Sequence, residues 1–88
     1  MKGTISIVKL ADSGSFRVIF YGTEMPEDMN PGASYIARGD EGLGTFLSAI
    51  GLPSDRQQAI RDALKFESST NILDYFISDE VLRRFGLI

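Results

Sequence analysis

The sequence contains no cysteine and no histidine, and these two absences exclude much of the chemistry that a small protein can carry out. Without cysteine the chain has neither disulfides nor a thiolate nucleophile. Without histidine it lacks the commonest general base near neutral pH and the commonest zinc ligand, so only oxygen ligands remain for a metal. We therefore expect a protein that is not an enzyme and that has no cofactor and no metal site.

The sequence also lacks a strong charge of one sign and long hydrophobic runs. Nine lysines and arginines against twelve acidic residues give a net charge of -3, which provides no general attraction to nucleic-acid phosphates or anionic lipid. The apolar residues near the amino terminus are too few and too interrupted for a signal peptide, and no run approaches the length of a membrane span. We therefore expect a cytoplasmic protein that does not associate with a membrane.

The composition is that of a folded chain. Of the 88 residues, 43% are hydrophobic and 24% are charged, and the nine glycines and three prolines are spread along the chain as turn residues. A chain of this length supports one core rather than two. Residues 1–88 are therefore expected to form a single globular domain.

The clearest pattern predicts a pair of helices between residues 40 and 66. Asp40 is the expected N-cap of the first helix. Gly51 is expected to end this helix in the left-handed conformation of a Schellman motif, and Pro53 prevents its continuation. Apolar residues repeat at i, i+3, i+4 and i+7 and predict one buried stripe, formed by Leu43, Phe46, Leu47 and Ile50.

The second helix is expected to begin with a capping box between Ser54 and Gln57. Asp55 follows in the first turn, where the helix dipole favours an anion. The predicted buried stripe consists of Ala59, Ile60, Ala63 and Leu64.

Two segments at the start of the chain predict a β-hairpin. Residues 4–11 and 16–21 are rich in β-branched and aromatic residues, and they flank a turn in which Gly14 takes the left-handed bulge position. If Ala11 pairs with Ser15, one face carries Val8, Leu10, Phe16, Val18 and Phe20. The opposite face then carries Ile5, Ile7, Ile19 and Tyr21, with Lys9 and Arg17 near the turn. Because both faces are partly apolar, we expect one of them to be covered by the C-terminal segment or by another subunit.

The remaining elements are shorter. Residues 22–34 read as a long loop, and residues 35–38 as a short third strand. Residues 71–77 fit either a strand or a helical turn, with the strand favoured. Ser78 is expected to cap a short final helix that Gly86 ends. Together the elements predict an α+β fold, in which the hairpin and one or two further short strands form a small antiparallel or mixed sheet against the helix pair and the C-terminal helix.

Residues 8–19 resemble the first hairpin of swapped-hairpin transcription factors and antitoxins, whose dimers place basic hairpin residues on DNA. The Ile-Pro step and the helix that follow in that family are absent after Ile19. The resemblance implies DNA contacts from Lys9 and Arg17 at the hairpin tip. The helix pair also suggests a helix-turn-helix, in which Arg56 and Arg61 of the second helix would have to contact phosphate beside Asp55 and Asp62.

By elimination, the sequence favours a small module without catalytic activity that binds a protein partner or its own copies. Phe85, Leu87 and Ile88 are the apolar candidates for that contact, and the alternative is that these three residues close the core. A regulator that binds nucleic acid through the hairpin-tip and helix cations is the second hypothesis, which the net charge does not favour.

We expect no more than weak, salt-sensitive binding to duplex DNA, because a net negative protein with few clustered cations releases few counterions. A gel shift near physiological salt measures this binding. Sub-micromolar, sequence-selective binding would instead favour the regulator hypothesis.

Overall fold

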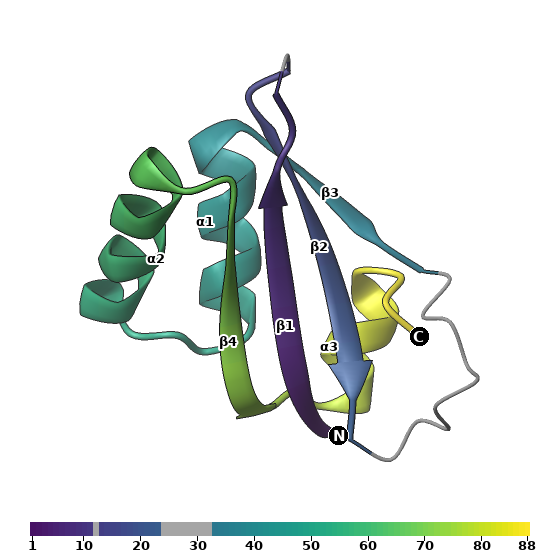
Figure 1. Ribbon diagram of the computed structural model, residues 1–88. Helices are drawn as coiled ribbons and strands as arrows, with labels where there is room; N and C mark the ends of the chain where they lie inside the picture. The colour runs from purple at the N-terminus through teal and green to yellow at the C-terminus, as the bar shows by residue number, and fades with distance from the viewer. Residues whose placement is uncertain (12, 24–32) are drawn as a thin grey trace.

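The computed structural model describes residues 1–11, 13–23 and 33–88 (Figure 1). In chain order the elements are β1 (Lys2–Lys9), β2 (Ser15–Gly22), β3 (Tyr35–Arg38), α1 (Gly39–Ala49), α2 (Ser54–Phe66), β4 (Ser69–Phe76) and α3 (Asp79–Arg84). The predicted α+β fold is confirmed, including the short third strand and the strand preference for residues 71–77. The loop predicted at residues 22–34 lies mostly outside the described residues.

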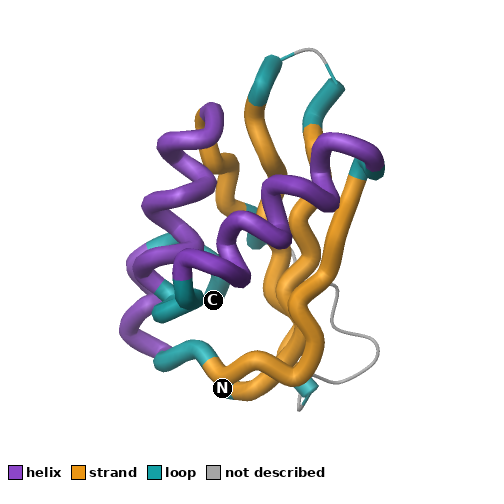
Figure 2. Tube along the Cα trace, turned by 90° about the vertical axis from the view of Figure 1, so that its left-hand side faces the viewer, coloured by secondary structure: helices purple, strands orange, loops and turns teal. Residues whose placement is uncertain are grey.

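The four strands form one antiparallel sheet in the order β3-β2-β1-β4. Figure 2 shows α1 and α3 on one side of this sheet, whereas α2 crosses beside its edge strand β4. Alternate side chains of the strands enter the layer between sheet and helices, where one cluster of buried apolar residues forms the core. No helix in the described part of the chain is long and apolar enough to cross a membrane.

The predicted stripe of α1 is confirmed, since Leu43, Phe46 and Leu47 are fully buried and Ile50 is nearly so. The stripe predicted for α2 is correct only in part, because α2 packs beside the edge strand β4 instead of across the sheet. Leu64 is buried, Ile60 and Ala63 are half-buried, and Ala59 is exposed.

The predicted hairpin register is wrong by one residue. Ile7 lies opposite Val18, and the Leu10 N–H donates to the Ser15 carbonyl at 2.9 Å, so Ser15 does not pair with Ala11. A shift of one residue turns every side chain of one strand to the other face of the sheet. In the observed register Ile5 and Ile7 are in the core. Burying these two side chains stabilises this register over the predicted one.

The two faces of the hairpin change accordingly. The core face joins Ile5 and Ile7 with Phe16, Val18 and Phe20. Val8 and Leu10 are only half-buried and do not belong to the core. Gly14 has a φ of 66°, which confirms its predicted left-handed conformation.

The ending of α1 is the predicted Schellman motif. Gly51 has a φ of 80°, and its N–H donates to the Ser48 carbonyl at 3.0 Å. The Leu52 N–H donates to the Leu47 carbonyl, also at 3.0 Å. These two bonds satisfy carbonyls that the end of a helix otherwise leaves without partners.

The final helix α3 has the same type of ending, and its start is also as predicted. Gly86 has a φ of 69°, and the Leu87 N–H donates to the Leu82 carbonyl at 2.8 Å. At the other end, the Ser78 Oγ accepts a bond from the Val81 N–H at 3.3 Å, which confirms Ser78 as the N-cap.

The predicted starts of the other two helices are wrong. The N-cap of α1 is Arg38, without a side-chain bond, so Asp40 lies inside the first turn. The N-cap of α2 is Pro53, so Ser54 is already helical and no capping box forms. Because the helix begins one residue early, the Gln57 side chain reaches back to the interhelix turn and donates to the Leu52 carbonyl at 2.8 Å.

A β-bulge in β4 decides which of its residues point inward. Ile72 lies opposite Ile5 and Tyr75 lies opposite Gly3, so two residues, Leu73 and Asp74, share the space opposite one residue of β1. Asp74 has a φ of 50° at this irregularity. The bulge turns Tyr75 toward the helices, where its hydroxyl donates to the Ile50 carbonyl at 2.7 Å.

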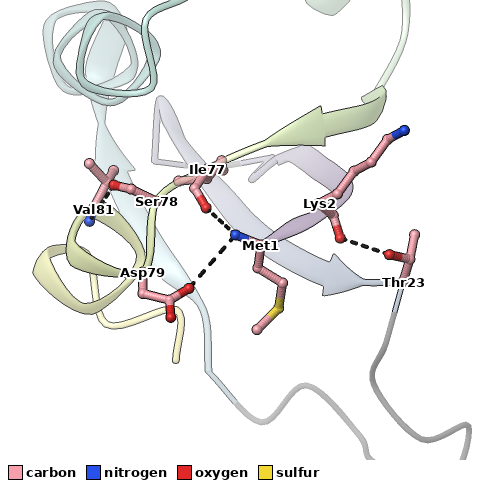
Figure 3. Close-up of polar contacts among 7 residues, drawn as sticks. All are labelled: Met1, Lys2, Thr23, Ile77, Ser78, Asp79 and Val81. Carbon is pink, nitrogen blue, oxygen red and sulfur yellow. Dashed lines mark hydrogen bonds and ion pairs between the residues drawn. The ribbon is translucent and has the colours of Figure 1, made fainter.

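The first residues of β1 are tied to elements on both sides (Figure 3). The terminal amine of Met1 donates to the Ile77 carbonyl at 2.6 Å and lies 3.7 Å from the Asp79 carboxylate. On the other side, the Thr23 hydroxyl donates to the Lys2 carbonyl at 3.0 Å. These contacts hold the start of β1 between β2 and the segment that enters α3.

Gly51→Val is expected to lower the free energy of unfolding by at least about 1 kcal/mol, because a β-branched residue is strained in the left-handed conformation. An added Cβ would meet only the Tyr75 hydroxyl at 3.9 Å, so the cost comes from the backbone and not from crowding. Gly51→Asn is the matched control, since asparagine tolerates this conformation and should cost less. Equal denaturation midpoints for the two variants, at equal slope, would contradict this account.

Candidate interaction surface

Two surfaces of the molecule are candidates for a functional site, and the first is a small cleft between the helices and the sheet. Its volume is about 220 Å³, below the roughly 300 Å³ at which ligand pockets usually begin. It is lined by Lys9, Phe16, Asp40, Leu43, Arg61, Leu64 and Lys65. Three cations around an apolar floor suggest an anion site, so the partners of these cations decide its role.

The cations of the cleft bind groups of the protein itself. The Lys9 Nζ donates to the Leu64 carbonyl in the last turn of α2 at 2.7 Å, where a cation also favours the helix dipole. The Arg61 guanidinium donates to the Asp40 carbonyl at 3.3 Å and joins α2 to the start of α1. Lys65 lies 3.5 Å from Asp62. The cations of the cleft therefore have a structural role, because their contacts hold the helices in place.

The second surface is the face of the sheet that points away from the helices, which we call the open face. Strand pairing and side-chain alternation define its members. They are Lys2, Thr4, Ser6, Val8, Ser15, Arg17, Ile19, Tyr21, Ile36, Arg38, Ser69, Asn71, Leu73, Asp74 and Phe76. None of them is buried, and no described helix or strand covers them. Figure 1 is seen from this side, with α1 and α3 behind the strands.

Large apolar side chains are concentrated on the open face. Tyr21 is 44% exposed, Ile36 40%, Leu73 70% and Phe76 67%, and among the described residues only Phe66 and Ile88 are other large apolar side chains exposed to this degree. A single exposed apolar side chain needs no explanation, but a group on one face of a sheet is typical of an interaction site.

The apolar residues of the open face form two groups at opposite ends of the sheet. At the hairpin end, Val8 lies opposite Arg17, and Arg17 lies opposite Ile36. Ile19 is two residues further along β2 and completes this group. Near the start of β1 the second group consists of Tyr21, Leu73 and Phe76, where Phe76 lies opposite Lys2.

The open face also differs in charge from the rest of the chain. Lys2, Arg17 and Arg38 are exposed on it, and Asp74 is the only acidic residue in the four described strands. Neither ion pair found among the described residues involves these three cations. A net negative protein thus presents a locally positive, partly apolar surface.

Lys9 and Arg17, which the predicted register placed on the same face of the hairpin, lie on opposite sides of the sheet. Arg17 is on the open face, whereas Lys9 points to the helix side and binds the end of α2. The one-residue register shift separates them. A continuous basic stripe through both residues is therefore not formed.

The C-terminal candidates contribute mainly to the interior. Leu87 is only 3% exposed and belongs to the core. Phe85 is half-buried, with its ring 4.8 Å from that of Tyr35 and 5.2 Å from that of Phe46. Of these three residues only Ile88 is exposed. Most of this apolar segment therefore closes the core and is not a surface for a partner.

Leu73 and Phe76 were not identified as candidates from the sequence. Their segment alternates in both phases, and the bulge that turns Leu73 and Phe76 outward has no signal in the residue pattern.

The fold and this surface define a small α+β domain with an uncovered antiparallel sheet face. No protein-family model, curated protein or solved structure matches the chain. In the described ranges no three acidic residues gather in a way that could hold a metal ion.

Two neighbouring residues of β4 give a direct test of which face is open. Ile72→Ala is expected to destabilise the protein by about 2–5 kcal/mol, because it leaves a cavity in the core. Leu73→Ala is expected to change stability by less than about 0.5 kcal/mol, because this side chain is exposed. Thermal or chemical unfolding of both variants measures the difference, and similar losses for the two would contradict the assignment of Ile72 to the core and Leu73 to the open face.

Proposed function

We propose that this protein is a non-catalytic interaction module that binds a protein partner through the open face of its sheet. The observation that supports this proposal is the concentration of Tyr21, Ile36, Leu73 and Phe76 on one uncovered face. Antiparallel sheets commonly leave one face to solvent, with polar side chains on it, whereas six of the fifteen residues of this open face are apolar or aromatic. Covering these side chains would remove apolar area from water, at about 25 cal/mol for each Å².

A second copy of the chain fits the open face less well than a different protein. Two copies in a symmetric face-to-face dimer present the same residues to each other. Both copies would then bring the positive charges of Lys2, Arg17 and Arg38 into one interface, with Asp74 as the only strand acid to offset them. Like charges across an interface suppress such pairing.

Single-stranded nucleic acid is the second candidate, because exposed aromatic and basic side chains on an open sheet can stack bases and bind phosphates. Tyr21 and Phe76 are the only aromatic residues of the open face, and they lie on β2 and β4 with β1 between them. The other apolar members of this face are the aliphatic residues Val8, Ile19, Ile36 and Leu73. Aliphatic side chains do not stack with bases, which favours a protein partner.

The proposal is tested by selecting binders to the full chain from an unbiased library of displayed peptides and small folded scaffolds. The open-face variant is L73S/F76S. The matched control is F66S/I88S, which removes two apolar side chains that are also exposed but lie outside the open face. Selected binders are expected to lose at least about tenfold in affinity for L73S/F76S, equivalent to about 1.4 kcal/mol, and to keep their affinity for F66S/I88S.

Circular dichroism confirms that both double variants fold, so that a loss of binding reports on the surface. The proposal is contradicted if no binder is enriched, if binders tolerate both variants, or if only the control variant loses binding.

A further inference from the structure

We propose, building on the function proposed above, that the open face recognises an acidic partner: an extended protein segment that presents apolar side chains and aspartate or glutamate carboxylates on the same side. The charge of the open face, and above all the position of Arg17 within its apolar groups, supports this partner chemistry. The chain contains more acids than bases, so a positive surface is not a consequence of its overall composition.

Arg17 lies inside the apolar surface and not at its margin. It is exposed on β2 between two strand neighbours, with Val8 opposite it on β1 and Ile36 opposite it on β3. Neighbouring strands are about 4.8 Å apart, so a partner that covers both aliphatic side chains must also cover the arginine. The guanidinium would then be removed from water.

A covered arginine requires acceptors from the partner. An unpaired buried charge is strongly unfavourable, and the guanidinium fork fits a carboxylate with two parallel hydrogen bonds. The residues beside Arg17 on its own strand that share the open face are Ser15 and Ile19, and neither supplies a negative charge. Strands β1, β2 and β3 contain no acidic residue, so we expect the carboxylate to come from the molecule that binds.

The other apolar group has the same arrangement. Lys2 lies opposite Phe76, so a cation borders the aromatic ring at this end of the sheet. Arg38 lies two residues beyond Ile36 on β3 and borders the hairpin-end group. Both ends of the surface therefore combine an apolar side chain with a positive charge. Asp74, in the bulge, is the only acid of the strands that would oppose an acidic partner.

The alternation of charge and apolar surface indicates the form of the segment. Side chains of an extended chain that point to one side are two residues apart, whereas its neighbouring residues point to the other side. A peptide crossing the strands would meet the open face with every second residue, and among these residues apolar and acidic side chains would complement the apolar and basic side chains of the open face. The cations also attract such a segment at distances up to the Debye length, about 10 Å at 0.1 M salt.

The test uses the full chain and three synthetic peptide series that share the same apolar residues and have glutamate, glutamine or lysine two residues away from them, on the same side of an extended chain. An oligouridylate is the nucleic-acid probe. Amide chemical shifts of the labelled protein show where each probe binds, and fluorescence anisotropy gives its affinity at low and at physiological salt. We expect the glutamate peptides to bind on the open face at least about tenfold more tightly than the lysine peptides, with a difference that decreases as salt rises.

Variants of Arg17 separate its charge from its packing. Arg17→Gln is expected to remove most of the preference for glutamate over glutamine, while Arg17→Lys keeps part of it because lysine retains the charge without the fork. Arg56→Gln, at an exposed position of α2, is the matched control and should leave the preference unchanged.

The outcomes distinguish this proposal from the function on which it depends. Equal or weaker binding of the glutamate peptides, with shifts still on the open face, would overturn the acidic partner and keep the interaction module. Tighter binding of the oligouridylate through the same residues would overturn it in favour of single-stranded nucleic acid. Shifts confined to residues outside the open face, or no shifts with any probe, would overturn both proposals.

Discussion

The structure depends on the register of β1, the strand that joins the N-terminal hairpin to β4. Ile5 and Ile7 are fully buried, and they alternate with Thr4, Ser6 and Val8, which are not. A shift by one residue would exchange the two sets and expose both isoleucines. Because β1 pairs with β2 on one side and β4 on the other, its register determines which residues of the neighbouring strands reach the core.

The positions of the helices follow from contacts between helix ends and the sheet. The Tyr75 hydroxyl binds the Ile50 carbonyl at the end of α1, and Lys9 binds the Leu64 carbonyl near the end of α2. Each contact joins a strand side chain to a carbonyl that the helix leaves without an intrahelical partner. The cations of the cleft thus have structural partners, whereas the exposed apolar groups of the open face lie beside cations that neither ion pair of the described residues involves.

The same alternation that builds the core also builds the open face. Every inward residue of a strand has outward neighbours, and in this protein many of those neighbours are apolar or basic. Arg17 is outward because Phe16 and Val18 are inward, and Ile36 is outward because Ala37 is buried. The interaction surface is therefore not a separate addition to the fold, since one register determines both faces.

The sequence by itself determined the features that depend on neighbouring residues. The stripe of α1, the left-handed Gly51 and the Ser78 cap were all predicted, because helical periodicity and end motifs arise within one turn of the chain. Only the tertiary structure decided the hairpin register and the bulge at Asp74. Both faces of the hairpin are partly apolar, so the local pattern does not distinguish two registers one residue apart. Pairing with β4 and packing against the helices select one of them, because only long-range burial places Ile5 and Ile7 in a shared core and leaves Arg17, Leu73 and Phe76 outside it.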